Sequence, residues 1–338
     1  MVKVNLKKLA EVLNISISTV SKALHNSHEI SAETKQKVLA KAEELGYRPN
    51  PYAGSLRHHK TKTIAIIVPQ LNNYFFIQAI SGAESKSQEA GYHTLIYNSN
   101  DDIIKETSIM HQLQNGRVDG IIMSLALSTT TYQHLHSIIQ SGIPIVFFDR
   151  VCHEIETAKV ITDDFLSGFN ATEHLILNGS RDIAYLSIGR SISIDNKRMQ
   201  GYLEAITKHN IPIDENNRVI ECTGDKEIRY KKIYQLLSQK YRPTGIFCCV
   251  EALALICYEV CIELKIKIPE DIKIISFSNL PSAHLLSPSL TTISQPAHEM
   301  GLQSATLLIK YLENKKLVMT NENIVLRSKL VPRMSTQR

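Results

Sequence analysis

The sequence predicts a small, N-terminal all-α helix-turn-helix head, followed by an α/β body of two lobes with doubly wound parallel sheets. Two short amphipathic segments joined by a tight turn lie near the N-terminus. Positive charge is concentrated in the same region, since residues 1–62 hold eleven Lys or Arg against five Asp or Glu and the remainder 27 against 28. Beyond residue 62, β-branched runs alternate with amphipathic stretches in two successive sets, as in doubly wound lobes.

The composition is that of a soluble protein with two or three domains. The 338 residues are 43% hydrophobic and 21% charged. Because we find neither an apolar run of roughly 18 residues nor a signal peptide, we expect a cytoplasmic location without membrane contact. The six cysteines lack CxxC spacing, and Cys257 and Cys261, one helical turn apart, have no evident third ligand. We therefore expect no metal and no cofactor.

The head is predicted to contain three helices. A helical apolar repeat spans residues 3–13 and is ended by Asn14, a residue that tolerates the left-handed conformation. Ser16 is a natural cap for a second helix, and Ser31 for a third that runs to Leu45. In a helix-turn-helix the second helix enters the DNA major groove, and the basic charge of the head favours nucleic acid as its partner.

The body is predicted to be built from alternating strands and helices. The first lobe has strands at 63–68, 92–97, 120–123 and 144–148, with helices at 76–90, 103–115 and 132–141. The second has strands at 160–162, 183–187, 219–222, 245–249 and 272–277, with helices at 165–177, 198–209, 227–239 and 251–264. A helix at 297–312 is expected to return to the first lobe and a strand at 324–330 to the second.

A nucleotide-dependent enzyme is the main alternative for such a body. A dinucleotide fold should carry G-x-G-x-x-G after its first strand, but here Val68 is followed by Pro69-Gln70-Leu71. The sequence also lacks a Walker lysine loop, a G-x-S-x-G elbow and H-E-x-x-H. We therefore expect no enzymatic activity, because a fold alone does not confer a reaction.

Two sets of motifs resemble the LacI/GalR family of bacterial transcription regulators. The head carries Leu6-x2-Leu9-Ala10-x4-Ile15-Ser16-x2-Thr19-Val20-Ser21-Lys22-Ala23-Leu24, continued by Leu45-Gly46-Tyr47-Arg48-Pro49-Asn50. The body carries, among others, Val118-Asp119-Gly120-Ile121-Ile122 and Pro288-Ser289-Leu290-Thr291-Thr292-Ile293. The resemblance implies a periplasmic-binding-protein-like body and a repressor that binds a palindromic operator as a homodimer, controlled by a carbohydrate-type effector in the cleft between the lobes.

The resemblance also implies a domain organisation. The head would span 1–49 and a hinge helix or linker 50–60. The first effector-binding lobe would comprise 61–159 plus 291–320, and the second 160–290 plus 321–338. No heptad repeat that could zip dimers together follows the last matching segment, so we expect a dimer rather than a tetramer.

The DNA contacts implied by the resemblance fall on the second helix and the hinge. Ile17, Ser18 and Lys22 would face base edges, where Lys22 could donate to guanine. Ser16, Thr19 and Ser21 suit phosphates, although Ser16 could equally serve only as a helix cap. His25 stands near the DNA face where relatives have asparagine. In the hinge, Ala53 would permit close approach and Leu56 would wedge into the minor groove, unless Leu56 is an ordinary core residue.

The effector contacts are expected at the carboxyl ends of the strands, where open α/β sheets bind ligands. Arg198 would anchor the ligand with paired donors, and Asp149 would accept hydroxyl protons, unless it pairs with Arg150. Relatives carry a carboxylate where Ser278 stands, so we expect a less anionic cleft, in which an acidic sugar or a sugar phosphate binds more tightly than the matching neutral sugar. The set implied by the rule and the resemblance together is Asn73, Phe75, Phe76, Asp149, Arg198, Val250, Glu251 and Ser278. A solute-binding receptor and a body that binds a protein coregulator remain alternatives.

Overall fold

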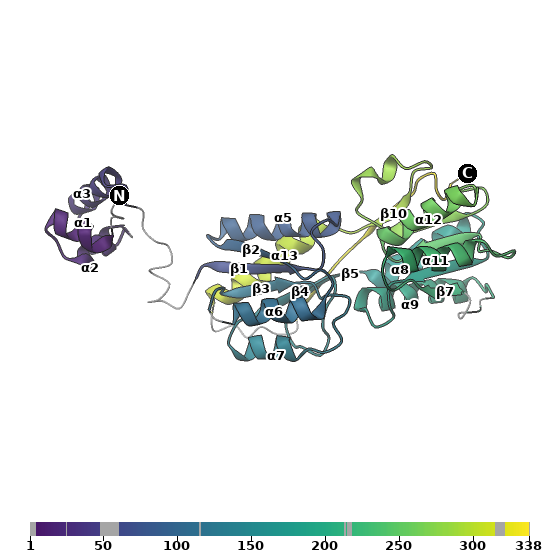
Figure 1. Cartoon of the computed structure of the whole chain (residues 1–338), viewed down its shortest axis with the longest axis horizontal. Coiled ribbons are helices and arrows are strands. Elements are labelled where there is room, and N and C mark those ends of the chain that lie inside the picture. Colours follow the sequence, from purple (N-terminus) through teal and green to yellow (C-terminus); the bar gives the residue numbers. More distant parts are fainter. Residues whose placement is uncertain are drawn as a thin grey trace. The chain divides into compact units, whose positions relative to one another are not determined.

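The computed structural model describes residues 5–24, 26–47, 61–114, 116–212, 214, 218–314 and 322–337. The chain forms two compact units, Met1–Thr61 and Lys62–Arg338, which are drawn in Figure 1. No helix of the described residues is long and apolar enough to cross a membrane.

The head consists of helices α1 (Leu6–Leu13), α2 (Ile17–Leu24) and α3 (Ala32–Glu44). The first helix begins at residue 6 rather than 3, because the Asn5 side chain caps it by accepting from the Lys8 N–H. Asn14 ends it in the left-handed conformation, with φ 52°. Apolar residues from all three helices form the small core of the head, in which Leu9, Val20 and Val38 are fully buried.

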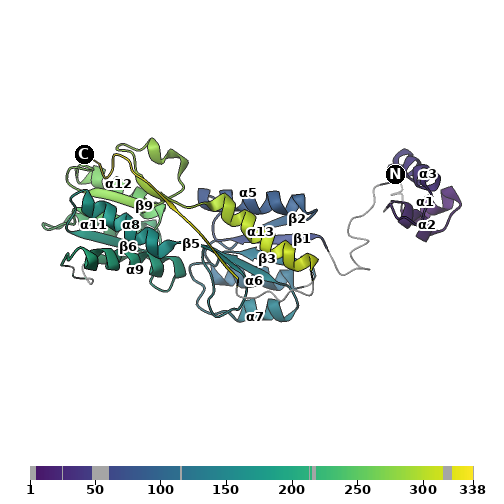
Figure 2. The same ribbon diagram turned by 180° about the vertical axis from the view of Figure 1, so that it is seen from behind.

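The first lobe is a six-stranded sheet in the order β11-β5-β4-β3-β1-β2. Helices α5 and α13 cover one face, while α6 and α7 cover the other (Figures 1 and 2). Both faces are buried, so β1 reads as a continuous apolar run with every residue buried. The elements are β1 (Thr63–Val68), α5 (Tyr74–Glu89), β2 (His93–Asn98), α6 (Ile103–Leu113), β3 (Gly120–Met123), α7 (Gln133–Gln140), β4 (Ile145–Phe148), β5 (Lys159–Thr162), α13 (Ala297–Glu313) and β11 (Asn323–Leu326).

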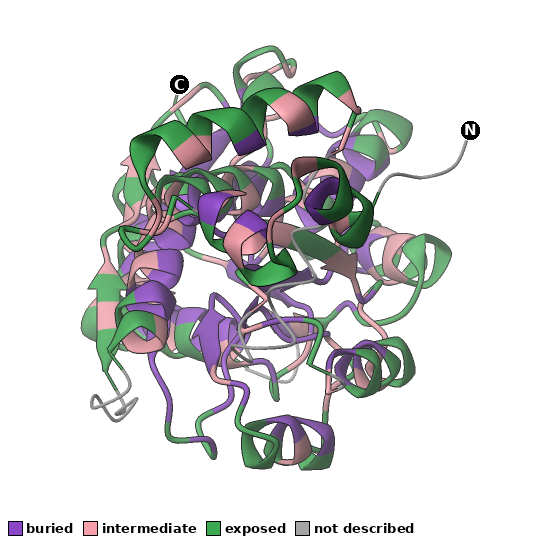
Figure 3. Cartoon of the chain, turned by 90° about the vertical axis from the view of Figure 1, so that its left-hand side faces the viewer, coloured by how far each residue is buried: buried purple, intermediate pink, exposed green. Residues whose placement is uncertain are grey.

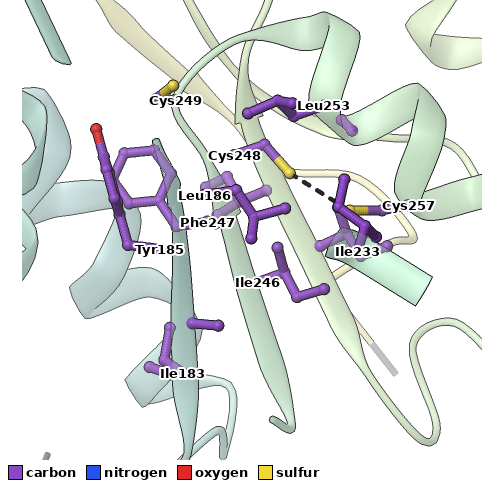
Figure 4. Close-up of a cluster of buried hydrophobic side chains, with 14 of the residues drawn as sticks. Ile183, Tyr185, Leu186, Ile233, Ile246, Phe247, Cys248, Cys249, Leu253 and Cys257 are labelled. Atoms are coloured by element: carbon purple, nitrogen blue, oxygen red, sulfur yellow. Dashed lines mark hydrogen bonds between the residues drawn. The ribbon is translucent and has the colours of Figure 1, made fainter. Parts of the chain in front are cut away.

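The second lobe repeats this plan with the order β12-β10-β9-β8-β6-β7, in which only β12 is antiparallel to its neighbour. Its core includes residues of β6, β8 and α12, among them Cys248 and Cys257, whose sulfurs lie 3.9 Å apart (Figure 4). All six cysteines are buried and free, and they pack as small apolar side chains. The elements are α8 (Asp164–Leu177), β6 (Ile183–Ser187), α9 (Ser193–Lys208), β7 (Val219–Glu221), α11 (Lys226–Leu237), β8 (Gly245–Cys248), α12 (Glu251–Glu263), β9 (Lys273–Phe277), the 3₁₀ turn η1 (Pro281–His284), β10 (Thr291–Ser294) and β12 (Lys329–Val331).

The helices that flank the two sheets carry buried residues on one side and exposed residues on the other (Figure 3). This division is the amphipathic pattern that predicted them. The strands between them are mostly buried, which explains why apolar runs located the strands so well.

The boundaries between the lobes differ from those predicted. Strand β5 pairs with β4 and so belongs to the first sheet, whereas β10 pairs with β9 and belongs to the second. The single strand expected at 324–330 is two strands, with β11 in the first sheet and β12 in the second. The predictions were wrong because each crossing takes only a few residues and leaves the strand periodicity unchanged.

The chain therefore crosses between the lobes three times, and side chains connect the crossings. Asp163, at the first crossing, accepts from the Ser328 N–H at the third (2.8 Å). Gln295, at the second, donates to the Thr162 hydroxyl at the first (3.2 Å). The three crossings are thus joined to one another by side-chain hydrogen bonds.

Candidate DNA-binding surface and effector cleft

In the head, Ser16 acts as a helix cap. Its hydroxyl oxygen accepts from the Thr19 N–H (3.1 Å) and lies 2.7 Å from the hydroxyl of Ser18 and 2.8 Å from that of Thr19. The three side chains therefore form one hydroxyl cluster at the start of α2. The capping role is the one that this geometry supplies, and contact with phosphate stays a prediction.

The exposed surface of α2 carries the residues expected to read bases. Ile17 and Ser18 are exposed at its first turn, where an apolar side chain such as Ile17 gains nothing from solvent. Lys22 is exposed in the last turn, and its ammonium forms an ion pair with Glu29. Ser21 is partly buried on the same helix. Three further predicted contacts, His25, Ala53 and Leu56, lie outside the described residues, as does the hinge at 50–60.

In the body, the structure brings all eight predicted effector residues to one cavity between the lobes. Asn73, Phe75, Phe76 and Asp149 come from the first lobe, and Arg198, Val250, Glu251 and Ser278 from the second. Five further residues line it: Arg150, Ile194, Phe277, Asn279 and Gln295, of which the carboxyl-end rule had missed only Gln295. The carboxyl-end rule located this cavity because both sheets direct their strand ends toward it.

Arg198 is the least exposed residue of the cavity wall, with 1% of its surface exposed. Its Nε donates to Asp164 Oδ1 (2.7 Å) and its Nη1 to the Cys249 carbonyl (2.7 Å), while its guanidinium lies 3.6 Å from the centre of the Phe277 ring. The Nη2 atom is buried without a hydrogen-bond partner among the described residues. This NH₂ group carries two N–H donors that no described residue satisfies.

Asp164 was missed by the sequence analysis. It is the first residue of α8, two residues after β5 ends, so the carboxyl-end rule could have selected it. Burial raises the pKa of its carboxyl to about 6, although the Arg198 guanidinium opposes this shift. It holds Arg198 in place and lines the larger cavity beside this one.

Asp149 follows β4 in the left-handed conformation, with φ 60°, and is 4% exposed. Burial raises the pKa of its carboxyl, while the positive charges of Arg150 and Arg198 lower it. The predicted alternative, an ion pair with Arg150, is not formed, because Arg150 Nη1 instead donates to Asp101 Oδ1 (2.5 Å). Arg150 Nε is a second buried donor without a hydrogen-bond partner in the described parts of the chain.

The aromatic side of the cavity is formed by the start of α5. Asn73 caps this helix by accepting from the Phe75 N–H (2.9 Å). The rings of Phe75 and Phe76 meet edge to face at 5.1 Å, and both are largely buried. Phe76 also packs against Phe148 of β4, so it belongs to the core as much as to the cavity.

The expectation of a less anionic cleft rested on Ser278, and it stays a prediction that the neighbouring Glu251 opposes. The Ser278 hydroxyl donates to Glu251 Oε2 (2.8 Å), so a carboxylate from α12 occupies this part of the cavity. Burial raises the pKa of Glu251, while hydrogen bonds from Ser278 and from the backbone of Asn279 and Leu280 lower it. The sequence placed Glu251 in the cleft but could not show this contact, because the two side chains belong to different elements.

A larger cavity of about 320 Å³ adjoins the first and shares Asp149 and Ile194 with it. It is bounded by the β5–α8 crossing and the start of α9, with Phe165, His153 and Lys197 in its wall. The first cavity, of about 40 Å³, is much the smaller of the two. A small ligand would therefore extend from the polar cavity into the larger one.

Models of two known protein families match this chain, one in the head and one in the body. The model for bacterial regulatory proteins of the lacI family matches residues 5–50, and that for the periplasmic binding protein-like domain matches residues 172–336. The ribose operon repressor of Haemophilus influenzae is 30% identical over 309 residues, covering 91% of this chain and 92% of that protein.

Two solved structures extend the similarity. The lac repressor dimer bound to operator and the anti-inducer ONPF aligns with a TM-score of 0.84 at 23% identity, covering 99% of both chains. A LacI family transcriptional regulator from Enterococcus faecium, solved with bound ribose, aligns with a TM-score of 0.69 at 28% identity, covering 81% of this chain and 98% of that one. The chain therefore belongs to the LacI family of bacterial regulatory proteins, and like its relatives it is a DNA-binding transcription regulator and not an enzyme.

Proposed function

We propose that this chain is a repressor that binds an inverted-repeat operator as a homodimer. Its affinity for the operator changes, in either direction, when a neutral, hydroxyl-rich small molecule enters the cleft. The observation that carries the effector proposal is the pair of buried guanidinium donors, Arg198 Nη2 and Arg150 Nε, which have no hydrogen-bond partners in the described residues. Buried donors are costly to leave unpaired, and both residues line the same cavity.

The charges of the cavity favour a neutral ligand over an anionic one. Each guanidinium already has a carboxylate of its own, Asp164 for Arg198 and Asp101 for Arg150. Asp149 and Glu251 then remain as additional acids in the wall. Sugar hydroxyls can both accept from the arginines and donate to the acids, whereas an anion would add negative charge to a site where carboxyl groups already outnumber the arginines. The ribose bound to the Enterococcus faecium relative supports the same class.

The cleft lies beside the three crossings between the lobes, and this position supports coupling to DNA. A ligand that contacts both lobes stabilises one arrangement of the three crossings over others, and a coupling of about 1–3 kcal/mol would suffice for regulation. The DNA contacts expected from sequence remain part of the proposal: Ser16, Ile17, Ser18, Thr19, Ser21, Lys22 and His25 on the head, and Ala53 and Leu56 in the hinge.

Calorimetry on the full chain tests the effector class with matched pairs: glucose and glucuronate, galactose and galacturonate, ribose and ribose 5-phosphate. We expect at least one neutral sugar to bind, and to bind about tenfold or more tightly than its acidic partner, because the acid meets Asp149 and Glu251. Fluorescence anisotropy on an operator selected from random duplex then shows whether that sugar weakens or strengthens DNA binding.

Two results would contradict the proposal. Tighter binding of the acid in every pair that binds would refute the charge argument while leaving the cleft as the site. Binding of none of the six, with the operator affinity unchanged by all of them, would refute a sugar effector altogether.

A further inference from the structure

We propose that Glu29 is a specificity-determining residue of the DNA-binding surface, acting on Lys22 through their ion pair. The inference rests on the proposed function, in which Lys22 reads a base edge. The carboxylate of Glu29 is held against the ammonium of Lys22, the lysine expected to contact DNA.

The backbone of the loop between α2 and α3 fixes this pair. The Ser27 N–H donates to the Lys22 carbonyl (3.0 Å), and the Ser27 hydroxyl accepts from the Glu29 N–H (3.3 Å). The next residue, Ile30, packs against the core of the head. Glu29 is therefore anchored on both sides, and its Oε2 contacts the Lys22 ammonium although about half of each side chain is exposed.

An exposed ion pair of this kind adds little to stability, because water screens it and two long side chains must be ordered. A carboxylate at a surface that approaches DNA also has a cost for binding, since it repels phosphates and cancels one cation. Glu29 thus weakens binding to DNA in general. This loss of affinity is offset only at a base pair with which both Lys22 and Glu29 form hydrogen bonds.

The chemistry of the pair identifies that sequence class. The Lys22 ammonium has three donors, of which Glu29 takes one, so the others can reach O6 and N7 of guanine. A carboxylate at the same place can accept from the N4 amine of cytosine, which is the acceptor role that acids play in the major groove. Lysine alone is a point charge that any phosphate satisfies. Paired with Glu29, it favours a G·C pair and opposes random sequence.

The test compares four forms of the full chain: wild type, Glu29→Gln, Lys22→Gln and the control Glu44→Gln. Glu44 is also an exposed acid of the head paired with a lysine, Lys41, but at the far end of α3. Selection from a random-sequence duplex pool gives the base preference of each form. Anisotropy across a salt series then gives its affinity for the wild-type operator and for random duplex.

We expect Glu29→Gln to bind random duplex roughly 3- to 10-fold more tightly, with a log–log salt slope steeper by about one per head. It should lose the base preference at the position where Lys22→Gln also loses it, and the ratio of operator to random affinity should fall about tenfold. Glu44→Gln should leave preference and ratio unchanged. Melting temperatures should agree within a few degrees among all four forms, because both acids are exposed.

The outcomes separate this inference from the proposal beneath it. If Lys22→Gln loses a base preference while Glu29→Gln keeps every preference and matches Glu44→Gln on random duplex, only the role of Glu29 is overturned. If wild type selects no sequence at all, specific recognition by this surface is wrong, and the role of Glu29 is overturned with it.

Discussion

At the scale of single residues, the cleft is organised around one guanidinium. Arg198 donates two hydrogen bonds within its lobe, to Asp164 and to the Cys249 carbonyl, and its guanidinium lies over the Phe277 ring. A fixed fork can satisfy these contacts and still present a further N–H in a defined direction. An ammonium can carry the charge but not this geometry.

Arg198→Lys should therefore weaken binding of the neutral sugar by about 10- to 100-fold, since charged hydrogen bonds contribute roughly 1.5–3 kcal/mol. DNA binding without ligand should persist. Calorimetry and operator anisotropy measure the two effects. The matched control is Arg190→Lys, at an exposed residue that pairs with Glu221 on the same lobe. Equal sugar affinity in Arg198→Lys and wild type would mean that the fork is not the anchor.

The residues of the cleft were predictable to the extent that they follow strand ends. Asn73, Asp149 and Glu251 each stand directly after a strand or at the start of the next helix, and one geometric rule places them together. Asp164 and the contact between Glu251 and Ser278 were not predicted. The strand-end rule also covers Asp164, whereas the contact between Glu251 and Ser278 joins side chains of different elements, about which periodicity along the chain contains no information.

At the scale of elements, both lobes pack two helices through facing glycines. Gly82 of α5 faces Gly301 of α13, and Gly168 of α8 faces Gly201 of α9, each against the backbone of its partner helix. A Cβ on Gly82 would lie 1.9 Å from the His298 carbonyl oxygen, and one on Gly301 would lie 1.8 Å from that of Ala79. Backbones this close leave no room for a methyl group, so the helices would have to separate.

Gly82→Ala should therefore destabilise the body by roughly 1–3 kcal/mol, the usual cost of overpacking a core, even though alanine is the better helix former by about 1 kcal/mol. Urea unfolding of the full chain measures it. Ser81→Ala, at the exposed neighbouring position of α5, should change stability by only a few tenths of a kcal/mol. Gain of stability in Gly82→Ala would show that α5 and α13 are less closely packed than described.

The elements themselves were largely predictable, because buried parallel strands and amphipathic helices have distinct periods. Strand β1 and helix α8, for example, lie within a residue of their predicted bounds. The assignment of elements to lobes was not predictable in the same way. Strands β5 and β10 have the composition of any buried strand, and only pairing partners decide which sheet receives them.

At the scale of the whole molecule, the first lobe exposes apolar side chains at one edge. Strand β2 is the edge of its sheet, and Leu95 and Ile96, which point to opposite faces, are 40% and 47% exposed. Ile104 at the start of α6 is 77% exposed, and Tyr74 and Ile77 are exposed on α5, which contacts β2. An uncovered apolar edge favours self-association, and a closed dimer would use the same patch on both copies.

If this patch joins two copies, Ile96→Lys should convert the dimer to a monomer, because a two-fold axis doubles the inserted charge at the interface. Light scattering at micromolar concentration measures the change. Operator affinity should fall by more than about a hundredfold, since one head then loses the avidity of two, while affinity for a single half-site should hold. The control Leu177→Lys also replaces an exposed apolar side chain, at the end of α8. It should leave both the mass of the particle and the operator affinity unaltered. If the Ile96→Lys variant remains a dimer, the interface lies elsewhere. If the wild type is a monomer and still binds the inverted repeat tightly, operator binding does not require a dimer interface.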